Sequence, residues 1–162
     1  MALYWYARSA KTMPLLQYLA CYQVIEFYFP IYASSQSNSE SKASKEKEQL
    51  EITLLKSLEL PDLITFITAS KGRGNHFSKA NILTTQALKP ERTDIDLIKS
   101  VAQRIYNIRC KIVHTKSHRS KGNERPIFPH SKEVDIIQKD IELIHFISRR
   151  VLLTASNGLS DY

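Results

Sequence analysis

Arg109 and His114 pair a permanently charged group with a titratable one, five positions apart in the stretch RIYNIRCKIVHTK. A guanidinium is a planar fork of donors that suits oxyanions, and an imidazole gains or loses a proton near neutral pH. Together, such groups can hold an anion and transfer protons on it. The same spacing arises easily by chance, so on its own it leaves the function undecided.

The helix that must carry this pair is predicted from about residue 94 to about residue 115, where Thr93 and Asp96 resemble a capping box. At about 100° per residue, Arg109 projects from the middle of an apolar stripe, and His114 lies about 140° away. His114 therefore shares the polar face with neighbours that include Asn107 and Cys110. A distorted helix end, a swing of the long Arg109 side chain or a second subunit would be needed to bring the two groups together. The stripe consists of Ile98, Val101, Ala102, Ile105, Ile108, Ile112 and Val113.

A second long helix is predicted over residues 13–33, and its apolar stripe also contains a charge, Glu26. Because an unpaired buried charge is strongly unfavourable, we predict that Glu26 contacts Arg109. Polar residues within this segment favour a buried core helix over a membrane span or a signal peptide. The predicted stripe is Leu15, Tyr18, Leu19, Tyr22, Ile25 and Phe29.

The rest of the chain is punctuated by polar and glycine-containing segments, with no internal repeat and no strand alternation outside the N-terminus. These patterns predict an all-α fold, a bundle of four to five helices in one domain over residues 1–162. We expect a short strand or the cut edge of a longer protein at LYWYA (3–7), and a mobile polar loop at 34–44 that ends in an N-cap at Ser44. Helices are predicted over KEKEQLEITLLKSLEL and DLITFITAS, and KGRGN (71–75) is predicted to stop the second of them. A basic loop at 116–130 then leads to a final helix that is capped by Ser131 and buries Val134, Ile137, Ile141, Ile144, Ile147 and Val151.

Composition narrows the classes of partner and of chemistry. The chain has 23 Lys and Arg against 16 Asp and Glu, a formal net charge of +7 that favours polyanions but does not distinguish RNA, DNA, an acidic protein and an anionic membrane. Its two cysteines, Cys21 and Cys110, are too far apart in sequence for a disulfide framework or a zinc quartet, which suits the cytoplasm. With no phosphate loop, G-x-S-x-G or HExxH, we expect no metal, no cofactor and no membrane association.

Taken together, RIYNIRCKIVH and the segment ARSAKTMPLLQYLACYQVIEFYFP resemble the HEPN superfamily, the higher eukaryotes and prokaryotes nucleotide-binding domains. Members are all-helical and carry an arginine, four to six intervening residues and a histidine near the end of a long helix. The match covers roughly residues 7–150, is nearest to prokaryotic members, and pairs Glu26 with the acidic residue of their opening helix. Cys110 stands where many members have Asn, Asp or His after the arginine, and Asn107 lies one turn earlier on the same face.

The resemblance implies a metal-independent endoribonuclease whose cleft is formed by two protomers, in a toxin or phage-defence role with an antitoxin or a sensor protein as a possible partner. Arg109 would hold the scissile phosphate of RNA, and His114 would transfer a proton at the 2′-hydroxyl or the leaving 5′-oxygen. Glu26 would orient Arg109. The residues expected to bind the RNA backbone are Lys116, Arg119, Lys121 and Arg125.

A non-catalytic reading of the same resemblance stays open. The chain would then be a basic HEPN-like helical module that dimerises or binds RNA, possibly the C-terminal part of a larger protein. Lys116 also occupies the position where members controlled by nucleotidyl transfer have a tyrosine, so we do not expect that form of control.

Overall fold

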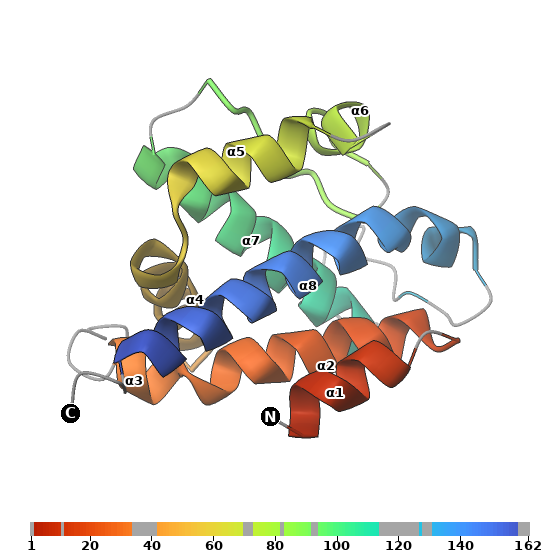
Figure 1. Ribbon diagram of the computed structural model, residues 1–162. Coiled ribbons are helices and arrows are strands. Elements are labelled where there is room, and N and C mark those ends of the chain that lie inside the picture. Colours follow the sequence, from red (N-terminus) through yellow and green to blue (C-terminus); the bar gives the residue numbers. More distant parts are fainter. Residues whose placement is uncertain are drawn as a thin grey trace.

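The computed structural model describes residues 2–10, 12–33, 42–69, 73–81, 83–91, 94–113, 127 and 131–158. Throughout these ranges the regular structure is helical and no strand occurs, which confirms the all-α prediction (Figure 1). The helices are α1 (Ala2–Ser9), α2 (Pro14–Phe27), α3 (Phe29–Ala33), α4 (Lys42–Ser57), α5 (Leu60–Thr68), α6 (Arg73–Phe77), α7 (Asp94–Val113) and α8 (Lys132–Gly158).

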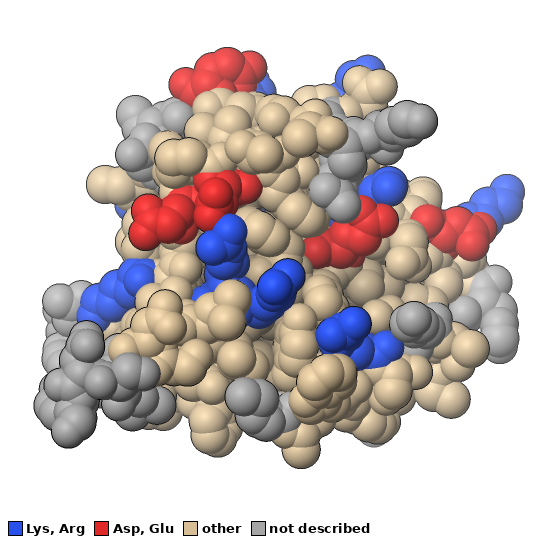
Figure 2. Space-filling view, in the orientation of Figure 1, with Lys and Arg blue, Asp and Glu red and all other residues tan. Residues whose placement is uncertain are grey.

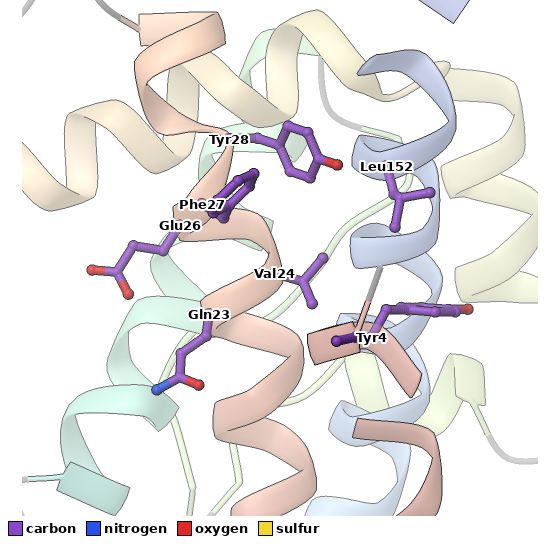
Figure 3. Close-up of a pocket in the computed structure, with 8 residues that line it drawn as sticks. Tyr4, Gln23, Val24, Glu26, Phe27, Tyr28 and Leu152 are labelled. Carbon is purple, nitrogen blue, oxygen red and sulfur yellow. The ribbon is translucent and has the colours of Figure 1, made fainter. Parts of the chain in front are cut away.

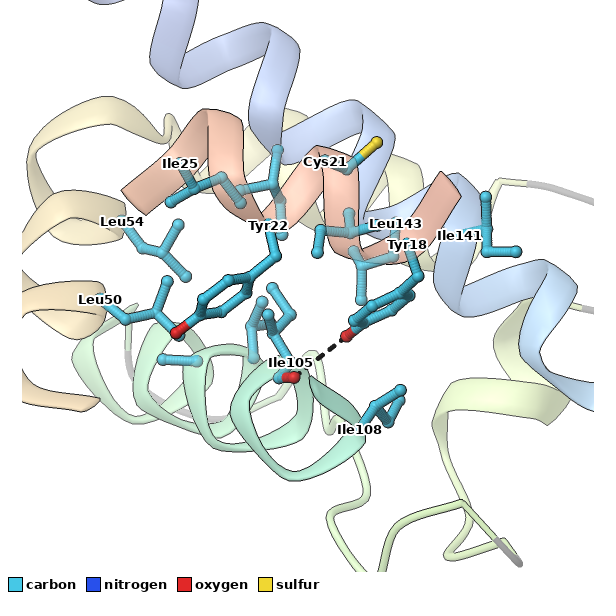
Figure 4. Packing of buried hydrophobic residues seen from close by; sticks show 14 of the residues in the cluster. Tyr18, Cys21, Tyr22, Ile25, Leu50, Leu54, Ile105, Ile108, Ile141 and Leu143 are labelled. Atoms are coloured by element: carbon cyan, nitrogen blue, oxygen red, sulfur yellow. Dashed lines mark hydrogen bonds between the residues drawn. The ribbon is translucent and has the colours of Figure 1, made fainter. Parts of the chain in front are cut away.

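The core lies where four of these helices, α2, α4, α7 and α8, pack against one another. Figure 4 shows Tyr18 and Tyr22 projecting from α2 toward α7, with Leu50 and Leu54 of α4 beside Tyr22. The hydroxyl of Tyr18 donates to the carbonyl of Ile105 at 3.1 Å, which satisfies a polar group within the apolar interface. The short helices α1, α3, α5 and α6 cover the edges of this arrangement (Figure 1).

Helices α7 and α8 bury the faces that the spacing of their apolar residues predicts. On α8, the predicted apolar stripe is buried except for Val134, which is partly buried against the same core. On α7, all predicted stripe residues are buried apart from Val113, at its end. A spacing of three and four residues repeats on one side of a helix, and burying that side supplies most of the stabilisation.

Residues 13–33 were predicted to form a single helix, and this prediction is wrong, because the segment divides into α2 and α3 at Tyr28. Pro30 lacks an amide hydrogen and cannot donate to the carbonyl of Glu26, which interrupts the helical ladder. The amide of Tyr28 donates instead to the carbonyl of Ile25 at 3.0 Å, in a tighter turn.

Three predicted boundaries are corrected. LYWYA belongs to α1 and not to a strand, because Tyr4 packs against a side chain of α8 and the described residues offer no partner strand. Ser44 is not a cap, since α4 begins at Lys42; residues 34–41 of the polar loop lie outside the described residues. The KGRGN segment does not end α5, which stops at Thr68 before it, and α6 begins within it.

Candidate functional site

Arg109 lies about one turn before the end of α7 and reaches across to two other helices. Its Nη2 is 3.2 Å from Oε1 of Glu46 on α4, and its Cζ lies 5.5 Å from the ring centroid of Tyr22 on α2. The hydroxyl of Tyr22 donates to the same oxygen of Glu46 at 2.8 Å. The guanidinium is therefore held by a charge pair on one edge and by an aromatic ring on one face.

This cluster of Arg109, Glu46 and Tyr22 is partly open to solvent. The side chain of Arg109 is 20% exposed and that of Glu46 is 16% exposed. Burial lowers the pKa of Arg109, but the neighbouring Glu46 carboxylate and then Tyr22 raise it, and the net shift is upward. Burial and the hydrogen bond to Glu46 raise the pKa of Tyr22, so this hydroxyl stays protonated and continues to donate.

The predicted contact between Glu26 and Arg109 is wrong. Glu26 lies on the exposed face of α2, together with Gln23 and Phe27. Positions 23, 26 and 27 share one side of a helix, and the other sides of α2 pack against α1, α7 and α8. The carboxylate that meets Arg109 belongs instead to Glu46, from a helix that follows a polar tract in the sequence.

Glu26 lines a surface pocket between α1, α2 and the end of α8, with a volume of about 570 Å³. Figure 3 shows Val24, Tyr28 and Leu152 around this pocket, with Tyr4 on its α1 side. In the same view the Glu26 carboxylate points away from these apolar side chains. The walls suit an apolar group, and neither Arg109 nor Glu46 lines the pocket.

The other two supporting residues, Asn107 and Cys110, also lie on α7, and of these Cys110 contacts Arg109. The side chain of Asn107 accepts a hydrogen bond from Gln103 Nε2 at 2.5 Å, one turn away on α7. Burial raises the pKa of Cys110, while hydrogen bonds from Tyr106 and Arg109 act in the opposite direction. Cys110 is therefore a protonated thiol at neutral pH, and it lies directly beside the guanidinium.

His114, the predicted proton-transfer residue, lies outside the described residues, and so do Lys116, Arg119, Lys121 and Arg125. Their catalytic and RNA-binding roles remain predictions. In the predicted basic loop, Ile127 alone is described, and it is buried with its amide donating to the carbonyl of Lys111 at 3.4 Å. Within the predicted basic loop, the chain at Ile127 therefore lies against the last turn of α7.

Sequence reasoning missed the fully buried charge of α7, which is Arg104 and not Arg109. Arg104 Nε is 2.6 Å from Asp140 Oδ1, and its Nη2 is 3.1 Å from Asp140 Oδ2. Its Nη1 donates to the carbonyl of Gln86 at 2.8 Å, and His76 Nε2 lies 2.7 Å from Asp140 Oδ2. The sequence did contain a signal for this pair. Asp140 interrupts the isoleucine stripe of α8, and a buried carboxylate implies a buried cationic partner.

Metal binding and membrane insertion find no support within the described ranges. No group of three or more His, Cys, Asp or Glu side chains there could hold a metal ion. Each described helix is too short or too polar to cross a bilayer.

Comparison with known proteins yields no match to a family model, to a curated protein or to a solved structure.

Proposed function

We propose that the chain is a metal-independent endoribonuclease of the HEPN type, in which Arg109 and His114 act on one phosphodiester of RNA. The 2′-oxygen would attack phosphorus and the bond to the 5′-oxygen would break, leaving a 2′,3′-cyclic phosphate and a 5′-hydroxyl. His114 would accept the 2′-hydroxyl proton or protonate the leaving oxygen. DNA lacks this nucleophile, so RNA is the expected substrate.

The observation that carries the proposal is the environment of Arg109. Its guanidinium is positioned by Glu46 and Tyr22 yet remains partly exposed, and the one ion pair within the described residues uses Nη2. Beyond its contacts with Glu46 and Cys110, the guanidinium has further N–H donors for the oxygens of a phosphate, whose negative charge grows in the transition state. Arg104, by contrast, is fully buried and its donors are directed at Asp140 and Gln86.

A homodimer fits the helix geometry of the two proposed catalytic residues. On one ideal helix, residues five apart point about 140° away from each other, so Arg109 and His114 of a single protomer diverge. Two copies related by a twofold axis would each contribute both groups to a shared cleft. We propose this arrangement for the active form.

The test uses labelled single-stranded RNA incubated with the full chain in excess chelator. Cleavage should give 2′,3′-cyclic ends, and Arg109→Ala and His114→Ala should each lower the rate by about a hundredfold or more. Lys99→Ala removes an exposed charge elsewhere on α7 and should cleave normally. RNA binding without cleavage, unaffected by substitution of Arg109 or His114, would instead identify the non-catalytic helical module.

The cellular role that we propose is that of a toxin or a phage-defence nuclease, restrained by an antitoxin or triggered by a sensor. The support is the resemblance to prokaryotic members, which commonly serve there. Expression of the chain should arrest growth, and expression of His114→Ala should not; equal growth with both would contradict this role.

A further inference from the structure

A second basic region lies where α1 packs on α8, on a surface that also exposes an aromatic side chain. The ring of Tyr4 lies 5.3 Å from that of His145, which joins the two helices. Trp5, the one tryptophan of the chain, is 60% exposed. The guanidinium carbon of Arg8 lies 5.3 Å from the Trp5 ring centroid. We call Trp5, Arg8, His145 and Arg149 the α1–α8 surface.

Two guanidinium groups lie near His145 on this surface, and Glu142 is the acidic residue that lies beside them. Burial lowers the pKa of His145, and the nearby guanidinium groups of Arg8 and Arg149 lower it further. Among the described residues, Arg8 and Arg149 form no ion pair, and the carboxylate of Glu142 is 3.2 Å from Lys139. Figure 2 shows several Lys and Arg side chains over the middle of this face, with Asp and Glu side chains next to some of them. Like charges held together in this way favour an anionic ligand.

A hollow of about 340 Å³ adjoins the charged groups along α8. Its wall contains the stacked rings of Phe66 and Phe146, 4.5 Å apart with an interplanar angle of 18°. Two amide side chains, Gln17 and Gln138, line it together with Glu142, His145 and Arg149. Amides both donate and accept hydrogen bonds, as the edges of nucleobases require.

We propose that the α1–α8 surface binds single-stranded RNA, with phosphates at Arg8 and Arg149 and an unpaired base stacked on Trp5. A duplex keeps its bases stacked on one another, so an exposed ring beside guanidinium groups selects single strands. This inference rests on the proposed function, which supplies the choice of RNA, and it adds that the RNA is single-stranded. Figure 1 shows α8 crossing in front of α7, and neither Arg109 nor Glu46 lines the hollow on α8.

The experiment follows the fluorescence of Trp5 while a short 2′-O-methyl RNA strand is added to the full chain. Such a strand cannot be cleaved through its 2′-oxygen, and stacking on the indole should quench emission from the one tryptophan. The matching duplex should quench much less. Arg149→Ala should weaken binding several-fold and reduce the slope of log affinity against log salt by about 0.7, whereas Arg149→Lys should keep the slope.

Controls separate this inference from the nuclease proposal. Lys99→Ala removes an exposed charge of α7 and should bind the strand as the unmodified chain does, and the binding assay is independent of whether RNA is cleaved. Equal quenching by strand and duplex, or unchanged affinity in Arg149→Ala, would overturn the inference. Displacement of the strand by polyglutamate at equal charge concentration would also overturn it, because that result would indicate an acidic protein partner.

Discussion

The partner of Arg109 is the residue-level finding with the most direct consequence for mechanism. A carboxylate beside the arginine was expected, yet it comes from Glu46 on α4 and not from Glu26 on α2. Tyr22 also contacts both ends of this pair, through its hydroxyl and its ring. Glu46 is therefore the candidate positioning residue for the guanidinium.

Replacing Glu46 by Gln should lower kcat for RNA cleavage about tenfold and change KM little, because the guanidinium would lose its fixed orientation and keep its charge. Glu26→Gln is the matched control, an equal loss of charge on the exposed face of α2, and should cleave at the normal rate. Single-turnover and steady-state rates measure the effect. Loss of cleavage in the Glu26 variant with normal cleavage in the Glu46 variant would reverse this assignment.

The buried pair of Arg104 and Asp140 is expected to contribute to the stability of the fold. Asp140→Ala should lower the free energy of unfolding by about 3–5 kcal/mol, because it leaves a buried guanidinium without its counter-charge. Asp62→Ala removes an acid from the exposed pair with Arg150 and should change it by less than about 1 kcal/mol. Urea denaturation followed by circular dichroism measures both, and similar losses in the two variants would contradict the distinction.

At the level of helices, α2 is the element against which the others are arranged. It packs against α1 on one side, α8 along its length and α7 through Tyr18 and Tyr22 (Figures 1 and 4). This burial on several sides explains why a single apolar stripe was an incomplete description of α2. The register of α2 on α7 also sets where Tyr22 meets Arg109.

Tyr18→Phe tests the registration of α2 on α7. Removing the hydroxyl that donates to Ile105 should reduce the free energy of unfolding by about 1 kcal/mol, since one hydrogen bond is lost without a cavity. Tyr6→Phe changes an exposed tyrosine on α1 and should be neutral. Thermal denaturation of both variants at one pH provides the comparison; a neutral Tyr18 variant would show that the bond is dispensable.

For the molecule as a whole, the position of the basic residues is more informative about a binding partner than the net charge. Four of the basic residues, Lys116, Arg119, Lys121 and Arg125, lie outside the described residues, and Arg8 and Arg149 lie on the α1–α8 surface. On that surface His145 is held near Arg8 and Arg149, with Tyr4 of α1 and Glu142 of α8 as its other ionisable neighbours. The stability of this contact should therefore depend on pH.

His145 has a lower pKa in the folded chain than in the unfolded chain, whose histidine titrates near about 6.5. Below that pH the unfolded state binds the proton first, so the free energy of unfolding should fall as the pH falls. His145→Gln should make this fall shallower. Urea denaturation between about pH 7.5 and 5 measures the difference, and parallel curves for the two proteins would contradict the assignment.

Local patterns were sufficient for the class of fold and for most of the helices. Spacings of three and four apolar residues predict α7 and α8, and Pro61 marks the start of α5, because both effects act within a few turns of the chain. The break at Tyr28 also had a local signal in Pro30. The prediction of an N-cap at Ser44 was wrong, because the preference of serine for helix starts is a weak guide to the residue at which a helix begins.

The pairing of charges depended on packing between distant segments. Many acidic residues were equally plausible partners for Arg109, and the choice of Glu46 follows from how α4 lies across α2 and α7. The same holds for Arg104 and Asp140, which are 36 positions apart. Periodicity reports which side of a helix is buried, whereas the identity of a partner depends on distances that exist only after the helices have packed together.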